Sequence, residues 1–105
     1  MNDDMQERTR ILLGDDGLAR LAQAHVLVAG VGGVGGAVAE ALARAGIGKM
    51  TLLDHDTVAL SNLNRQLVAL RSTLGRYKAE AMAERVRDIQ PGMQVHARVE
   101  FLRQE

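Results

Sequence analysis

The chain has 105 residues, of which 47% are hydrophobic and 25% charged, and its 13 basic and 13 acidic residues cancel. This balance argues against a domain devoted to nonspecific nucleic-acid binding. The lack of cysteine excludes disulfides, thiolate metal sites and a cysteine nucleophile within these residues. Because no apolar run reaches membrane-spanning length and the polar N-terminus is unlike a signal peptide, we expect one small domain in the cytoplasm.

The first half of the chain predicts an N-terminal extension followed by a strand and a helix. Residues 1–14 are expected to be a mobile arm, and Asp15 and Asp16, as caps, predict a short helix over 16–23. An apolar segment over 25–30 predicts the first strand. The pattern that follows it predicts a helix over 33–45.

The second half continues the alternation of strands and helices. A second strand is expected over 49–54, followed by residues 55–74, which show no sustained period and predict a functional loop with short helical turns. An apolar stripe predicts a third helix over 75–89. The alternation in 93–99 predicts a third strand.

These elements predict an α/β fold in a single domain over residues 1–105. Residues 1–24 would form an arm and a helix, and residues 25–105 the first βαβαβ half of a Rossmann-like doubly wound sheet. In the usual strand order the first strand lies at the centre of the full sheet, so one of its edges would here be bare. We therefore expect a fragment or a shortened relative that is marginally stable alone or associates through that edge.

A glycine motif joins the first strand to the following helix, which is the layout of a dinucleotide-type phosphate loop. Asp54 ends the second strand about 20 residues later, where a carboxylate accepts hydrogen bonds from a ribose. The pattern predicts an adenine-nucleotide site, and the alternative is a glycine turn that binds nothing. The glycines of the motif are Gly30, Gly32, Gly33 and Gly35.

A second group of polar residues follows the second strand, and its cations are Arg65 and Lys78. Since the carboxyl ends of parallel strands form the ligand edge of such sheets, we expect these side chains to converge on the phosphates. A guanidinium and an ammonium there offset charge on a phosphoryl group under attack. This favours nucleotide chemistry over an NAD-dependent oxidoreductase, which stays open as an alternative. The interpretation of both cations as ordinary solvated surface also stays open.

Five motifs in this order resemble the ubiquitin-activating-enzyme-like (ThiF/MoeB-type) adenylyltransferases. The segments 39–48 and 78–87, with the N-terminal arm, are similar in particular to the branch of tRNA threonylcarbamoyladenosine dehydratases. The motifs are Arg8-Thr9 with Leu12-Leu13-Gly14, then Gly30–Gly35, Leu53-Asp54-His55-Asp56, Asn62-Leu63-Asn64-Arg65-Gln66 and Gly75-Arg76-Tyr77-Lys78-Ala79-Glu80.

The resemblance implies ATP-dependent activation of a carboxylate, which attacks the α-phosphate, releases pyrophosphate and forms an acyl-adenylate. In the dehydratase branch the activated group would be the threonylcarbamoyl carboxylate of a tRNA adenosine, which then closes into a cyclic form. The alternative substrate is the C-terminus of a ubiquitin-like sulfur-carrier protein. A non-catalytic remnant that pairs with another chain also stays open.

The resemblance also assigns roles by position. The glycines would hold the triphosphate and AMP, and Asp54 the ribose hydroxyls. Arg65 and Lys78 would stabilise the transition state, and Arg8, with Arg10 as fallback, would be an arginine finger from the neighbouring subunit of a homodimer. The further nucleotide-binding residues implied are Asp56, Asn62 and Gln66, beside Arg65 and Lys78.

Two departures from the family pattern limit what this chain is expected to do alone. The magnesium ligand is expected beyond Glu105, and Gly36 stands where a serine or another small residue is commoner. We therefore expect the 105 residues to retain part of a nucleotide pocket while adenylating little or nothing.

Overall fold

The computed structural model describes residues 3–101, and within its first helix the side chains of residues 3–10, 12 and 13 are not described. Among the described residues, no helix combines the length and the apolar composition that crossing a bilayer requires. The elements in chain order are α1 (Asp3–Gln23), β1 (His25–Ala29), α2 (Gly33–Ala45), β2 (Lys49–Leu53), the 3-10 helices η1 (Leu60–Asn62) and η2 (Arg71–Thr73), α3 (Lys78–Ile89) and β3 (Gln94–Arg98).

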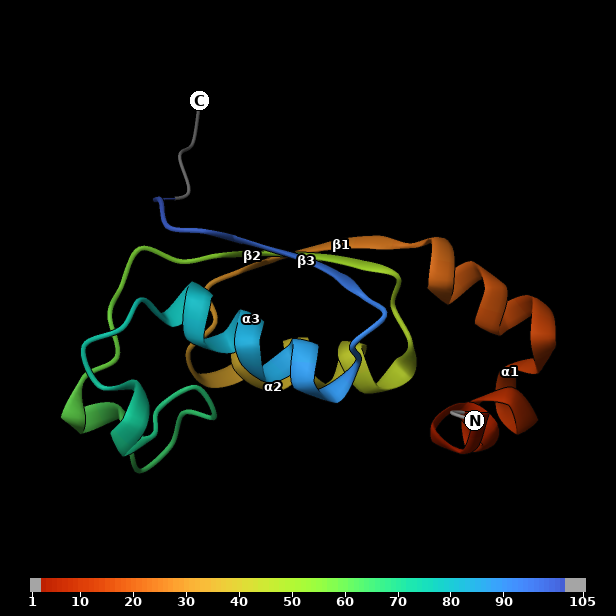
Figure 1. Cartoon of the computed structure of the whole chain (residues 1–105), viewed down its shortest axis with the longest axis horizontal. Helices are drawn as coiled ribbons and strands as arrows, with labels where there is room; N and C mark the ends of the chain where they lie inside the picture. Colours follow the sequence, from red (N-terminus) through yellow and green to blue (C-terminus); the bar gives the residue numbers. More distant parts are fainter. Residues whose placement is uncertain (1–2, 102–105) are drawn as a thin grey trace.

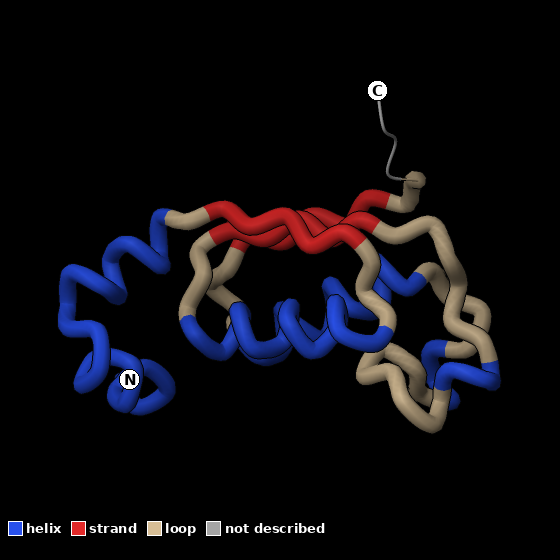
Figure 2. Tube along the Cα trace, turned by 180° about the vertical axis from the view of Figure 1, so that it is seen from behind, coloured by secondary structure: helices blue, strands red, loops and turns tan. Residues whose placement is uncertain are grey.

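The three strands form one parallel sheet in the order β1-β2-β3. Helices α2 and α3 lie side by side against the same face of this sheet, so the described part of the domain has two layers (Figures 1 and 2). The architecture confirms the predicted α/β class, and the βαβαβ order matches the first half of a Rossmann-like sheet. All three strands end at the edge that carries the long loop between β2 and α3 (Figure 1).

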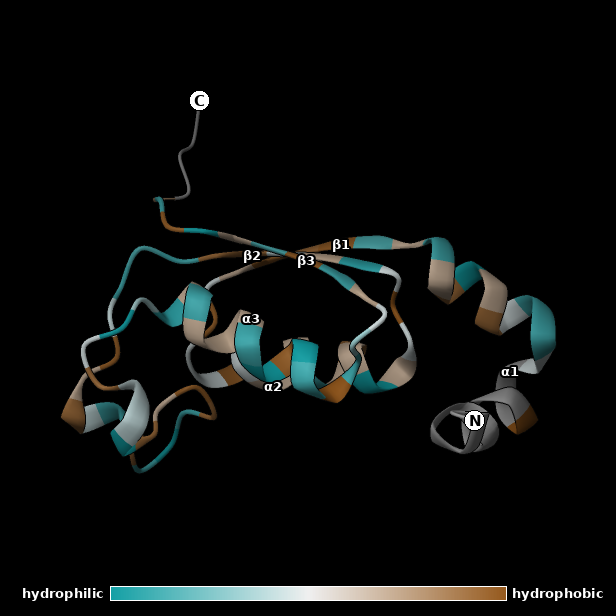
Figure 3. Cartoon of the chain, viewed as in Figure 1, coloured by the Kyte–Doolittle hydropathy of each residue, from teal (hydrophilic) through white to brown (hydrophobic). Residues whose placement is uncertain are grey.

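The core lies between the sheet and the two helices, and Figure 3 shows hydrophobic and hydrophilic residues alternating along both helices. Met82 and Val86 of α3 are fully buried, as the apolar stripe over that helix predicts. They pack in the same core cluster as Met50 and Leu52 of β2. The central strand β2 is the most buried of the three, with burial from its second residue to its last.

The other face of the sheet and the outer edge of β1 are not covered by any element of residues 3–101. Leu27 of β1 is exposed for this reason, although its type and its place in a strand would suit a core. His25 on the same strand donates to or accepts from Thr51 Oγ1 at 2.8 Å. The expectation of a bare edge on the first strand is confirmed for the described residues.

The N-terminal segment differs from the prediction. Helix α1 begins at Asp3 rather than after Asp15 and Asp16, and it is interrupted at Gly14, whose φ of 73° and ψ of 175° are not helical. Residues 3–13 contain no glycine or proline to prevent a helix. The helix was not predicted because the apolar residues of this segment do not form a clear amphipathic pattern.

The third helix also begins later than predicted. It starts at Lys78, not at residue 75, because Gly75 has a φ of 82° and Tyr77 is extended. The remaining strand and helix ends agree with the predicted ranges to within one residue.

Candidate functional site

The glycine motif forms a tight turn between β1 and α2. Gly30 and Gly33 have positive φ values of 85° and 53°, a conformation that side chains strongly disfavour. The Gly30 N–H donates to the carbonyl oxygen of Leu53 at 2.7 Å, which ties the turn to the end of β2. A side chain on Gly35 would overlap the Gly30 carbonyl oxygen, so the turn is too tight for one.

Asp54 connects the two loops at this edge of the sheet. Its Oδ2 accepts a hydrogen bond from the Val31 backbone N–H at 2.9 Å, and its Oδ1 accepts one from the Asp56 N–H at 2.8 Å. The carboxylate is partly buried and lies beside the glycine motif, as predicted. Each oxygen keeps a lone pair for a further donor such as a ribose hydroxyl.

A pocket of about 370 Å³ opens at the carboxyl edge of the sheet. Its aromatic wall is the stacked pair of His55 and Phe101, whose ring centroids are 3.8 Å apart at an interplanar angle of 23°. The sequence placed His55 near the site without a role and did not predict Phe101, although the position of Phe101 just after β3 was a usable signal, since ligands bind at that edge. The lining residues are Ala29, Gly30, Leu53, Asp54, His55, Asp56, Glu100 and Phe101.

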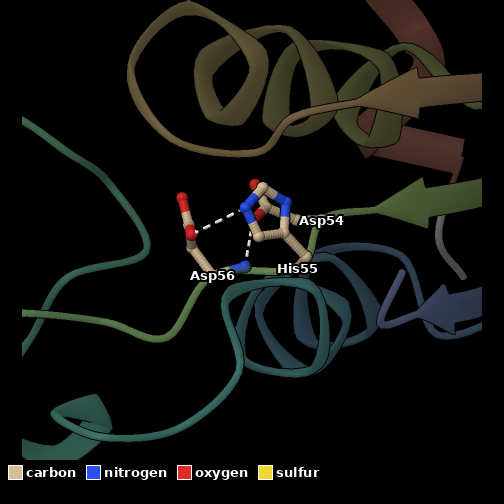
Figure 4. A group of neighbouring side chains, drawn as sticks. All are labelled: Asp54, His55 and Asp56. Atoms are coloured by element: carbon tan, nitrogen blue, oxygen red, sulfur yellow. Dashed lines mark hydrogen bonds and ion pairs between the residues drawn. The ribbon is translucent and has the colours of Figure 1, made fainter. Parts of the chain in front are cut away.

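Figure 4 shows the side chains of Asp54, His55 and Asp56, whose potential ligand atoms lie within 4.8 Å of one another. His55 Nε2 lies 3.1 Å from Asp56 Oδ1, and both side chains are exposed. Mg²⁺ requires about six oxygens in octahedral geometry. This group supplies two carboxylates, of which Asp54 already holds two backbone N–H groups and Asp56 pairs with an imidazole. These three side chains therefore do not by themselves complete the coordination shell of a magnesium ion.

The loop between β2 and α3 is closed by a short antiparallel ladder, which brings its two ends together. The Val58 N–H donates to the Arg76 carbonyl at 2.8 Å, and the Gly75 N–H donates to the Val58 carbonyl at 2.9 Å. The Lys78 N–H then donates to the Asp56 carbonyl at 2.9 Å. The first turn of α3 is thereby fixed next to Asp56 and the pocket.

Lys78 is only 8% exposed, and no carboxylate among residues 14–101 pairs with its ammonium group. It is the first residue of α3, where the helix dipole is positive and disfavours a cation. The interpretation of Lys78 as solvated surface is therefore wrong. For Arg65, which is exposed, that interpretation agrees with the structure.

The Arg65 and Asn62 side chains of the loop, which were predicted to contact phosphate, instead make hydrogen bonds within the loop. Arg65 donates to the Ser61 carbonyl at 2.8 Å and to Asn64 Oδ1 at 3.2 Å. Asn62 is 7% exposed, and its Oδ1 accepts the Ala59 N–H at 2.9 Å. The Gln66 amide lies against the glycine motif. The structure thus brings Asp54, Asp56, Gln66 and Lys78 close to the motif or the pocket.

The predicted arginine finger comes from a different part of the chain. Arg8 is in α1, and its side chain lies outside the described residues, as does that of Arg10. Helix α1 leads directly into β1 and so lies at the amino edge of the sheet, opposite the edge that carries Asp54 (Figure 1).

The chain resembles known proteins in both sequence and structure. A sequence profile described as the ThiF family matches residues 6–105. A Haemophilus influenzae protein named tRNA threonylcarbamoyladenosine dehydratase is 51% identical over 90 residues, which cover 86% of this chain and 34% of that protein. An Escherichia coli molybdopterin-synthase adenylyltransferase is 45% identical over 76 residues, or 72% of this chain and 30% of that protein.

The crystal structure of the E. coli tRNA N6-threonylcarbamoyladenosine dehydratase in complex with ATP aligns with a TM-score of 0.91 at 47% sequence identity. The alignment covers 94% of this chain and 41% of that chain. The present chain therefore spans about a third of the length of the curated relatives it matches.

Proposed function

We propose that this chain, which belongs to the ThiF family, carries the ATP-binding part of an enzyme that adenylates a carboxylate. The observation that carries this proposal is Lys78, a residue only 8% exposed that has no carboxylate partner among residues 14–101 and whose backbone N–H donates to the carbonyl of Asp56 in the pocket wall. A lysine ammonium at a helix N-terminus is disfavoured by the helix dipole, and an anion bound there would balance it. A phosphate group supplies that negative charge.

The other parts of the site fit a nucleotide. The first N–H groups of α2 are free of any side-chain cap, because its N-cap is Gly32, and they point to where phosphate oxygens would accept them. Asp54 lies next to this turn, where its carboxylate would accept hydrogen bonds from the ribose hydroxyls. The pocket of about 370 Å³ falls in the range of small-molecule sites and offers Phe101 as an apolar surface for the base.

The reaction we propose is the adenylation that the name of the E. coli adenylyltransferase gives for that relative. The carboxylate oxygen of the substrate attacks the α-phosphorus, the bond from that phosphorus to the bridging oxygen breaks, and pyrophosphate leaves with the electron pair. Lys78 offsets the charge that develops on the phosphoryl oxygens, and Arg65 joins it after leaving the Ser61 carbonyl. Arg8 of a neighbouring subunit would supply a third cation, since α1 of the same chain lies at the opposite edge of the sheet.

For the substrate we propose the threonylcarbamoyl group of a tRNA adenosine, which after adenylation closes on itself and releases AMP. The name of the H. influenzae relative at 51% identity and the E. coli structure at 47% support this choice. The alternative, the C-terminus of a ubiquitin-like sulfur carrier, is supported by the adenylyltransferase at 45% identity. Either reaction is proposed for the cytoplasm, with Mg²⁺ held by residues outside the described part of this chain.

A chimera tests this proposal. Residues 6–105 replace the matched part of the E. coli dehydratase, and conversion of threonylcarbamoyladenosine in tRNA to its cyclic form is followed by mass spectrometry. We expect conversion that requires ATP and is lost with Lys78→Met. A folded chimera that is inactive on tRNA but adenylates a sulfur-carrier protein would replace the first substrate by the second. A folded chimera active on neither would refute the proposal.

A further inference from the structure

The backbone conformation of Gly32 does not require glycine at this position of the motif. Its φ of −85° and ψ of 161° are those of extended backbone, which any residue adopts. Gly30 and Gly33, on either side of it, have the positive φ values that favour glycine. A different constraint must therefore apply at position 32.

That constraint is the side chain of Gln66. A Cβ atom on Gly32 would lie 2.8 Å from Gln66 Oε1, 2.9 Å from Cδ and 3.0 Å from Nε2. All three atoms of the amide group thus lie on the hydrogen side of Gly32, at the N-cap of α2. Since real Cβ contacts are longer than this, a side chain at position 32 would displace the amide or the turn.

The Gln66 side chain is carried by a firmly hydrogen-bonded piece of the loop. Its backbone N–H donates to the Asn62 carbonyl at 3.0 Å, and its carbonyl accepts the Ala69 N–H at 3.0 Å. Asn62 is itself buried and bonded to the Ala59 N–H. The backbone of Gln66 is therefore held in place, so the amide can leave Gly32 only by a change of its side-chain rotamer.

The amide oxygen of Gln66 is buried and accepts no hydrogen bond from the described residues. A buried acceptor without a donor is unfavourable, and such groups are rare enough in folded proteins to require a reason. Rotation of the amide by half a turn exchanges Oε1 and Nε2, and it presents an N–H donor where an anion at the α2 N-terminus would accept it. The orphaned oxygen thus points to a role at the occupied site.

We propose that Gln66 is a positioning residue that sets the N-terminal turn of α2 through its contact with Gly32, and that this contact requires glycine at position 32 even without a nucleotide. This inference rests on the proposed function, because the turn that Gln66 sets is the one that binds phosphate. The loop after β2 and the glycine motif after β1 then act as one unit.

A double-mutant cycle tests the inference on the 105-residue chain, with ATP affinity measured by calorimetry at a temperature where circular dichroism shows every variant folded. Gly32→Ala is expected to weaken ATP binding by at least about tenfold, and Gln66→Ala alone by less. Contacting residues couple strongly, so the double variant should bind ATP at least about fivefold more tightly than Gly32→Ala. Gln66→Glu keeps the side-chain size and is the control, because it should not rescue Gly32→Ala.

The outcomes separate the two claims. If the unmodified chain does not bind ATP, the proposed function fails and this inference fails with it. If the unmodified chain binds ATP and Gln66→Ala does not rescue Gly32→Ala, the nucleotide or the backbone limits position 32 and only the inference is overturned. If Gly32→Ala does not fold, the same comparison is made on the melting temperature, where the double variant should recover stability and Gln66→Glu should not.

Discussion

Asp54 at the end of β2 accepts a hydrogen bond through Oδ2 from the backbone N–H of Val31 in the glycine motif, at 2.9 Å. Its other oxygen accepts the Asp56 N–H at 2.8 Å. One carboxylate therefore joins the two loops that border the pocket and also lines that pocket. The structural role of Asp54 and its proposed ligand-binding role coincide, so a substitution should affect both stability and ATP affinity.

Asp54→Asn leaves one carbonyl oxygen for two backbone N–H donors. One N–H then loses its partner, and we expect the free energy of unfolding to fall by about 1–3 kcal/mol. Urea denaturation measures the change, and ATP affinity should fall with it. Asp56→Asn is the matched control, because the Asp56 carboxylate is exposed and, among the described residues, pairs only with His55. Equal stability of the two variants would contradict this account of Asp54.

Lys78→Met separates stability from binding. Removal of a positive charge that has no carboxylate partner among residues 14–101 from a helix N-terminus should leave the ligand-free protein as stable as before, or more so. ATP binding should weaken by about 10- to 100-fold, since a charged contact to phosphate is lost. Denaturation and calorimetry measure the two effects. The chain's other lysine, Lys49, lies at the opposite end of β2, so Lys49→Met is the control and should bind ATP normally.

Gly35→Ala tests how tight the turn after β1 is. The added methyl group would overlap the Gly30 carbonyl oxygen, which is backbone and cannot rotate away. We expect a loss of stability of about 1–3 kcal/mol or more, the range for overpacking. Gly92→Ala is the control, because the nearest atom to its added methyl group is 4.0 Å away. A Gly35→Ala melting temperature equal to that of Gly92→Ala would refute the tight turn.

The contact between α2 and α3 predicts a pH dependence. Glu40 accepts hydrogen bonds from Arg85 at 2.7 Å and from Arg44 at 3.0 Å, and these bonds, that of Arg85 first, hold its pKa below the ordinary value of 4.5. A carboxyl with a lowered pKa in the folded state stabilises the protein above its unfolded pKa, and this contribution is lost as the pH falls through its folded pKa.

Glu40→Gln should therefore destabilise the protein near neutral pH, and its difference from the unmodified chain should shrink as the pH falls below about 4.5. Thermal unfolding over a pH series measures this difference. A difference that stays constant across the series would show that packing and not charge explains the effect of the substitution.

The sequence allowed the elements to be predicted because strands and α2 have clear periods and glycine boundaries. It also placed Asp54 beside the glycine motif, since the carboxyl ends of parallel strands share one edge. Helix α1 was missed before Gly14 because its apolar residues do not recur at helical spacing, and propensity alone is a weak signal.

Contacts made by the irregular loop could not be predicted. The spacing between Gly32 and Gln66 does not reveal the path of the loop, so the amide against the glycine appears only in three dimensions. The burial of Asn62 and the stacking of His55 on Phe101 are hidden for the same reason. Residue types at the site were therefore predictable, while their partners were not.

The central claim is an adenine-nucleotide site with Lys78 as its cation, and the most direct test is a thermal-shift comparison of the chain and Lys78→Met with ATP and Mg²⁺, with AMP and with NAD. A ligand at a hundred times its Kd stabilises by about 2.7 kcal/mol, which is several degrees for a domain of this size. We predict a shift with ATP that Lys78→Met reduces by about half or more, a shift with AMP and none with NAD. A shift with NAD alone, or none with any nucleotide on a folded sample, would contradict the account.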